Sequence, residues 1–228
     1  MNQVSSKDYV ALLRHGDYHQ QADTPSAWQP WPLTERGVAQ AVEGGDQLRR
    51  LIREHGLEIP TEIHSSTLLR AWQTSLGVAQ SLGLEPQAIF TTDKLAERGV
   101  GAAANLTLAQ IEQAVNLDPR HDPLPHDWKR SPRYRLPFPG AESLLAAGQR
   151  VAGYVEQVAG ASEHPNSLHV FIGHGASLRH ADWHMGVLTE TEVGQYSMFH
   201  ATPVLLCRTV HGWHRIGGEW KRRHQYLD

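Results

Sequence analysis

Residues 10–16 constrain the fold more than any other stretch of this sequence. They read Val-Ala-Leu-Leu-Arg-His-Gly, four apolar residues followed at once by two basic side chains and a glycine. An apolar run without polar alternation is typical of a strand buried on both faces of a parallel sheet. Ligands bind beyond the carboxyl ends of such strands, so we expect Arg14 and His15 at the mouth of a crevice, with Gly16 allowing a sharp turn.

A second strand candidate ends in a similar way. Residues 167–172 read Ser-Leu-His-Val-Phe-Ile, and Gly-His-Gly-Ala-Ser follows at 173–177 before a helical pattern. Because parallel strands end at the same sheet edge, His15 and His174 are expected to face each other across one pocket. Taken alone, the first stretch is equally compatible with strand-end side chains that face solvent, because a motif of three residues is short.

Strand and helix candidates alternate along the rest of the chain. Further strands are predicted at 62–64, 88–92 and 203–210, and helices from Thr34 to the stop at His55-Gly56, at 68–82, at 108–115, over 143–159 and over 177–186. In the 68–82 helix, residues 65–67 are predicted as turn and N-cap, and Leu69, Trp72, Leu76 and Ala79 as one apolar stripe. We predict an α/β fold, a three-layer α/β/α sandwich with a mostly parallel central sheet and helices on both faces.

The length of the chain and the absence of a low-complexity linker indicate a single domain over residues 1–228. A chain of 228 residues can bury one sizeable core. Residues 105–140 contain a proline-rich stretch and are predicted as an insertion that covers the substrate. The polar loop 17–32, which carries Trp28 and Trp31, is expected to form a pocket wall or lid.

Composition excludes several classes of function. The net charge of -3 gives no basic field for nucleic acid, and the single Cys207 excludes an internal disulfide and a thiolate metal cluster. Neither a signal-peptide pattern nor an apolar run of membrane-spanning length is present, so we expect a cytoplasmic protein that does not act at a membrane. Whether the chain forms a homodimer stays open.

The two strand-end motifs resemble those of the histidine phosphatase superfamily, the phosphoglycerate mutase-like proteins. That family carries Arg-His-Gly after its first strand and a later His-Gly with a second catalytic histidine. Residues 66–74 read Ser-Thr-Leu-Leu-Arg-Ala-Trp-Gln-Thr and match the family pattern Ser-x-x-x-Arg-Ala-x-x-Thr in full. Residues 32–37 and 140–143 also match its recurrent Pro-Leu-Thr-x-x-Gly and Gly-x-Glu-Ser patterns. The resemblance spans roughly residues 8–180.

The resemblance implies a role for each matching residue. His15 would be the nucleophile that forms a phosphohistidine, and a protonated His174 would stabilise the transition state. Glu97, in a Leu-x-Glu context, would protonate the leaving oxygen. Arg14 and Arg70 would clamp the phosphate through planar guanidinium groups. Substrate contacts are also expected from Gly175, Gln21 and Arg98, together with the backbone N–H groups that open the helix at 175–176; no metal or cofactor is implied.

Two departures from the family bear on the reaction. Gln21 stands near the place where members often carry Asn, and Leu108 stands where the mutases carry a Lys that contacts phosphoglycerate. Residues 128–131, Trp-Lys-Arg-Ser, resemble the mutases' Trp-Arg-Arg-Ser, so Lys129 and Arg130 would meet an acidic substrate or be exposed linker charges. We favour a metal-independent phosphatase, acting on a phosphorylated small molecule or phosphopeptide, over a mutase.

Three alternatives belong to other classes. His180, Asp182 and His184 have a spacing that can bind zinc, although a polar helix face explains them better. Residues 99–104 partly match the glycine-rich fingerprint of dinucleotide-binding proteins, but a charged segment separates them from the preceding strand. A non-catalytic phosphate-binding module on the same scaffold is the third, and the presence of all five chemical residues argues against it.

Overall fold

The computed structural model describes residues 7–162 and 166–223. Within them a six-stranded sheet has the order β3-β2-β4-β1-β6-β7. These strands are β1 (Asp8–Arg14), β2 (Ile63–Ser66), β3 (Ile89–Thr92), β4 (Leu168–Gly173), β6 (Pro203–Thr209) and β7 (Gly212–Gly217). The first four in the order pair in parallel, whereas β6 is antiparallel to β1 and β7 to β6. A mostly parallel sheet is therefore confirmed.

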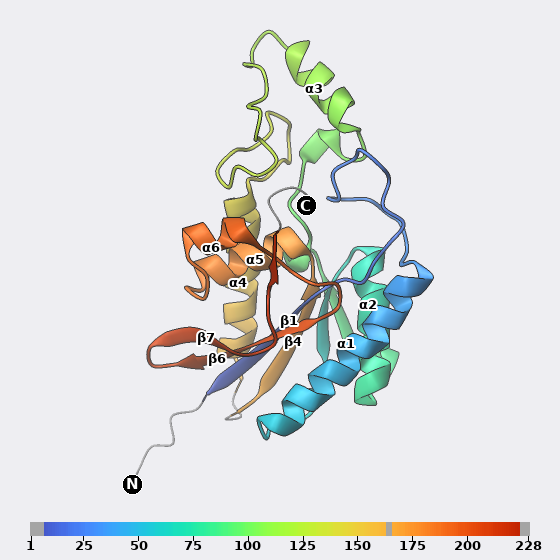
Figure 1. The fold of residues 1–228 in the computed structure, drawn as a ribbon, viewed down its shortest axis with the longest axis vertical. Helices are drawn as coiled ribbons and strands as arrows, with labels where there is room; N and C mark the ends of the chain where they lie inside the picture. The colour runs from blue at the N-terminus through green and yellow to red at the C-terminus, as the bar shows by residue number, and fades with distance from the viewer. Residues whose placement is uncertain (1–6, 163–165, 224–228) are drawn as a thin grey trace.

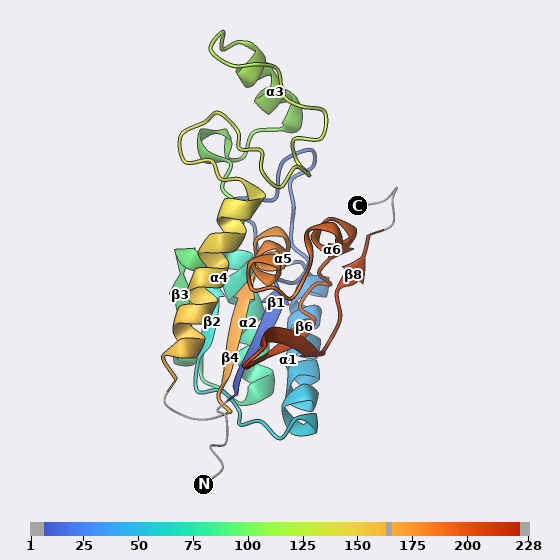
Figure 2. The same cartoon turned by 90° about the vertical axis from the view of Figure 1, so that its left-hand side faces the viewer.

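Helices cover both faces of this sheet, as predicted (Figures 1 and 2). On one face lie α1 (Glu35–Glu54) and α2 (Leu69–Leu82); on the other lie α4 (Leu144–Gly160) and α5 (Gly175–His184). Val10 and Leu12 pack into the apolar cluster of α4 and α5, and Ala11 and Leu13 into that of α1 and α2. Because β1 is buried on both faces, its sequence shows no polar alternation.

The N-terminus of α1 explains the Pro-Leu-Thr-x-x-Gly pattern. Thr34 caps the helix by accepting a hydrogen bond from Gly37 N at 3.0 Å. A Cβ on Gly37 would overlap with Asp17 O, and one on Gly16 would overlap with Gly37 O. Gly16 does not have a positive φ; glycine is required there because α1 packs directly against the loop after β1.

The start of α2 differs from the prediction. Ser65 and Ser66 belong to β2, and the N-cap position is Leu68, which gives no side-chain cap. The predicted apolar stripe was also wrong, since Leu69 and Trp72 are each 38% exposed. The buried face carries Arg70, Thr74 and Ser75 as well as apolar residues, because Arg70 and Thr74 form hydrogen bonds with the backbone of residues 16–29, which covers this end of the helix.

Residues 105–140 extend beyond the carboxyl edge of the sheet (Figure 1). They contain α3 (Leu108–Asn116), and the remainder is irregular. A small apolar cluster of their own includes Ile111, Trp128 and Leu136, and Ala27 of the 17–32 loop joins it. The two segments therefore pack against each other above the sheet edge.

The C-terminal part was predicted only as strand-like stretches. It also contains α6 (Glu190–Gln195), which begins with a capping box between Thr189 and Glu192. A two-stranded sheet pairs β5 (Tyr196–Ser197) with β8 (Lys221–Arg222). Among the described residues, no helix has the length and apolar character needed to cross a membrane.

Candidate active site

His15 follows directly on β1 and is 1% exposed. Its Nδ1 lies 2.7 Å from Gly16 O. A carbonyl oxygen can only accept a hydrogen bond, so Nδ1 carries the ring proton. The other ring nitrogen, Nε2, is then left with a lone pair, which is the form that a nucleophilic imidazole requires.

His174 lies beside it because β1 and β4 are neighbouring parallel strands. The register pairs Arg14 with Gly173, so the next residue of each strand meets at the sheet edge. The two rings have centroids 5.1 Å apart, and His174 is fully buried. A hydrogen bond of 2.8 Å joins His174 Nε2 to Ser66 Oγ at the end of β2.

The 66–74 motif supplies three supports around this pair. Ser66 contacts His174, Arg70 lies in the first turn of α2, and Thr74 Oγ1 accepts a hydrogen bond from Gly16 N at 2.9 Å. The last bond fixes the backbone just after His15. The pattern therefore fixes the surroundings of both imidazoles in addition to presenting a guanidinium.

The two arginines approach from different sides. Arg14 Nη1 donates to Met198 O at 3.1 Å, and a Cβ at Gly175 would lie only 3.1 Å from Arg14 Cδ. Glycine at this position therefore lets the Arg14 side chain pass close over the first turn of α5. Arg70 is 0% exposed, and its Cζ lies 4.6 Å from the centre of the Tyr18 ring, which in turn contacts His15.

Arg70 also holds the 17–32 loop, which the sequence did not indicate. Its Nη groups donate to Gln29 O, Ser26 O and Ala27 O, each at 2.8 Å, whereas its buried Nε makes no hydrogen bond within the described residues. The fully buried Gln29 side chain shapes the same loop through hydrogen bonds to three backbone groups of residues 21–25. The loop thus closes over the histidine pair.

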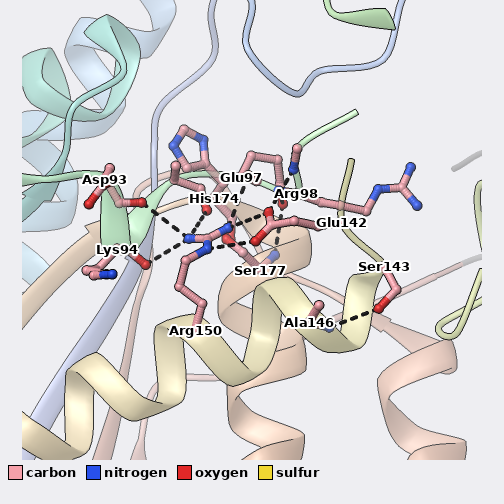
Figure 3. Close-up of polar contacts among 12 residues, drawn as sticks. Asp93, Lys94, Glu97, Arg98, Glu142, Ser143, Ala146, Arg150, His174 and Ser177 are labelled. Atoms are coloured by element: carbon pink, nitrogen blue, oxygen red, sulfur yellow. Dashed lines mark hydrogen bonds and ion pairs between the residues drawn. The ribbon is translucent and has the colours of Figure 1, made fainter. Parts of the chain in front are cut away.

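Glu97 is held at the N-terminus of α5 (Figure 3). Its Oε2 accepts from Ala176 N at 3.1 Å, and its Oε1 accepts from Ser177 N and Arg98 N, each at 2.9 Å. The side chain thereby satisfies two of the backbone N–H groups that a helix leaves without partners in its first turn. The Ala176 N–H, which we had expected to face a phosphate, therefore bonds to Glu97 instead.

The Gly-x-Glu-Ser motif fixes the segment that carries Glu97 (Figure 3). Glu142 accepts two hydrogen bonds from Arg150, at 2.9 and 2.8 Å, and one from Gly99 N at 2.9 Å. Arg150 further donates to four backbone carbonyls over residues 93–97. Sequence reasoning placed residues 142 and 143 only at a helix start; Arg150 carried no recognisable signal.

Both central histidines favour the neutral form. Burial lowers the pKa of His15 well below its ordinary value, and the charges of His174, Arg70 and Arg14 lower it further. Burial, followed by Arg70, Arg14 and Arg150, lowers the pKa of His174 in the same way. The expected protonated His174 therefore requires the negative charge of a bound phosphate, which opposes this shift.

Some residues predicted to contact the substrate do not point toward the two histidines. Gln21 is exposed, and only its backbone N is engaged, with Gln29 Oε1. The Arg98 side chain points away from His174 in Figure 3, and its Cζ lies 5.8 Å from the centre of the Trp128 ring. His180 and His184 each contact a backbone carbonyl, and no cluster of three metal-binding side chains occurs among the described residues. His200, which we had not singled out, lies 5.9 Å from His15 between ring centroids.

Two buried imidazoles and two guanidinium groups thus lie together at the carboxyl edge of a parallel sheet, an arrangement that can bind a phosphoryl group; we call this cluster the buried histidine pocket. A family model for the histidine phosphatase superfamily (branch 1) matches residues 10–215. The chain belongs to this superfamily.

Relatives within the family carry different activities. A 2,3-bisphosphoglycerate-dependent phosphoglycerate mutase of Parvibaculum lavamentivorans is 26% identical over 197 residues, covering 86% of this chain and 88% of the relative. Phosphoserine phosphatase 1 of Hydrogenobacter thermophilus is 29% identical over 179 residues, covering 75% and 72%. The crystal structure of phosphoglycerate mutase from Bacillus anthracis superposes with a TM-score of 0.70 at 16% identity, covering 93% of each chain. The last comparison supports the fold.

Proposed function

We propose that this protein hydrolyses phosphomonoesters through a phosphohistidine on His15. The observation that carries the proposal is the state of His15, whose Nε2 has its lone pair available beside a second imidazole and within the field of two arginines. This arrangement supplies a nucleophile and fixed positive charge at one point. Both are what phosphoryl transfer requires.

In the first step His15 Nε2 attacks phosphorus, and the bond from phosphorus to the ester oxygen breaks. Arg14 and Arg70 stabilise the charge on the transferring phosphoryl oxygens, and His174 adds a hydrogen bond. Glu97 gives its proton to the departing oxygen, which leaves as an alcohol. For this, the Glu97 carboxyl turns one oxygen away from the α5 backbone toward the leaving group.

In the second step water attacks the phosphohistidine. Glu97, now a carboxylate, accepts a proton from that water, and the bond between phosphorus and Nε2 breaks. Inorganic phosphate is released, and His15 returns to its neutral form with the proton still on Nδ1. The two guanidinium groups and His174 supply the charge stabilisation, so the proposal includes no metal.

A mutase-type phosphoryl transfer is the second candidate, because mutases are among the relatives. It requires retention of the phosphorylated enzyme and a second binding of the monophosphate. Leu108, at the position of the mutases' lysine, packs against the apolar cluster of residues 105–140 and presents no charge. This difference favours hydrolysis.

The test combines turnover with trapping of the intermediate. Wild-type protein should hydrolyse p-nitrophenyl phosphate and, after acid-free quenching, carry phosphate on His15 by mass spectrometry. His15→Ala should lose at least about a thousandfold in kcat, since the displacement depends on this nucleophile. A coupled assay with 3-phosphoglycerate and bisphosphoglycerate primer separates the mutase. Full activity in His15→Ala would refute the proposal.

A further inference from the structure

A cavity of about 570 Å³ lies beside the buried histidine pocket and is lined by basic side chains. Its cations come from three separate parts of the chain: the irregular segment after α3, helix α5, and the C-terminal strand β8 with the residue after it. They are Lys129, Arg130, Arg179, Arg222 and Arg223. Among the described lining residues the single carboxylate is Glu190, and Arg133 lies 3.7 Å from it. The described lining of the cavity is therefore predominantly basic.

Arg179 is the most unusual of these side chains. It is 4% exposed, its Nε makes no hydrogen bond within the described residues, and it takes part in none of their ion pairs. An arginine keeps its charge at neutral pH, and a buried charge without a partner is costly. Glu97 and Asp182 act on it electrostatically but form no direct ion pair with it, so an anion bound in the cavity would supply the charged hydrogen bonds that Arg179 lacks within the described residues.

The cavity lies on the Glu97 side of the reaction site. Ala176 lines it, and the N–H of this residue bonds to Glu97 Oε2. Arg179 follows on the next turn of α5 and lies within electrostatic range of both Glu97 and Arg14. In the proposed reaction Glu97 protonates the leaving oxygen, so the group attached to that oxygen extends toward this cavity.

We infer that the substrate is a bisphosphorylated metabolite, one phosphate of which reacts at His15 while the other is bound in the basic cavity by Arg179 and Arg222. The inference rests on the proposed phosphatase reaction. Several cations favour a phosphate dianion over a carboxylate monoanion, because more charge-assisted hydrogen bonds can form. The volume lies in the range of pockets that hold drug-sized ligands, which corresponds to a sugar or nucleoside rather than a three-carbon acid.

The experiment compares bisphosphates with their matched monophosphates. Probes are fructose 1,6-bisphosphate against fructose 6-phosphate, and adenosine 3′,5′-bisphosphate against adenosine 5′-monophosphate; p-nitrophenyl phosphate and 3-phosphoglycerate complete the set. Wild-type kcat/KM should be at least about tenfold higher for a bisphosphate, mainly through KM, since a charged hydrogen-bonded contact contributes this much or more. A preference for 3-phosphoglycerate would overturn the assignment to a phosphate.

Variants locate the effect. Arg179→Met should lower kcat/KM for the preferred bisphosphate by about thirtyfold more than for its matched monophosphate. Arg222→Met, at the exposed rim, should give a smaller loss of the same kind and does not endanger folding; Arg53→Met on the exposed end of α1 is the matched control. Equal losses on all substrates, or no loss, would overturn the inference. Failure to hydrolyse p-nitrophenyl phosphate would instead refute the proposed function itself.

Discussion

The buried histidine pocket and the basic cavity beside it are both positively charged, but they are built differently. In the pocket, Arg14, His15 and His174 are placed by the ends of two paired strands, and His15 and His174 are hydrogen-bonded by the chain itself. In the cavity, the cations come from an irregular segment, one helix and the C-terminal residues, and Arg179 Nε has no partner within the described residues. The buried histidine pocket suits a reaction that is common to all phosphomonoesters. The basic cavity suits the selection of substrates by the group attached to the leaving oxygen.

Arg70→Met should cause the largest loss of activity, and this loss should be the same for all substrates because Arg70 belongs to the buried histidine pocket and not to the basic cavity. It removes a guanidinium from the pocket and three hydrogen bonds to the 17–32 loop. We expect kcat to fall about a thousandfold on every substrate, since an arginine that stabilises phosphoryl transfer contributes this much. Steady-state kinetics on p-nitrophenyl phosphate and a bisphosphate measure it. A loss restricted to one of these substrates would place Arg70 with the cavity and break the distinction.

Glu97→Gln tests the residue that lies between the two regions. The amide oxygen can still accept from one of the two α5 N–H groups that Glu97 binds, but the amide nitrogen cannot accept from the other, and the side chain has no carboxyl proton to donate. An alkyl phosphate should lose about a hundredfold in kcat, because its leaving oxygen needs protonation. p-Nitrophenyl phosphate, with a stable leaving anion, should lose much less. Equal losses on both substrates would show that Glu97 acts only through the position of α5.

The pH dependence of stability gives the smallest effect, and the share that His15 contributes to it reports on the pocket. The pKa of His15 is lowered by burial and then by His174, Arg70 and Arg14, so the folded protein keeps this imidazole neutral. His15 of the unfolded chain gains a proton as the pH falls below about 6.5, so this one residue lowers the stability by about 1 kcal/mol for each further pH unit. Denaturant unfolding at pH 7.5, 6.0 and 5.0 should show a shallower decrease for His15→Ala. Identical slopes would mean that His15 ionises normally.

The sequence predicts the pocket much better than its surroundings, for a physical reason. Parallel strands end at one edge, so an apolar run followed by Arg-His-Gly and another followed by His-Gly bring their histidines together whatever the loops do. The apolar stripe predicted for α2 failed because burial at a crevice selects polar side chains, such as Arg70, that look exposed in a sequence.

Contacts that depend on loop conformation could not be predicted. Gln29 shapes the 17–32 loop by donating a hydrogen bond to Thr24 O. Arg150 holds the Glu97 segment by donating to Glu97 O, although the two residues are 53 positions apart in the sequence. The basic cavity joins residues 129–130, 179 and 222–223, which no local pattern connects. Of its members, only Lys129 and Arg130 could be linked to an acidic substrate, and only through family resemblance.

The most direct test of the account is a crystal structure of the protein with metavanadate. Vanadate takes the five-coordinate geometry of the phosphoryl transfer that we propose. We predict one vanadate in line with His15 Nε2, contacted by Arg14, Arg70 and His174, with Glu97 turned toward the oxygen opposite His15. A vanadate bound elsewhere, with His15 Nε2 out of reach, would contradict the account.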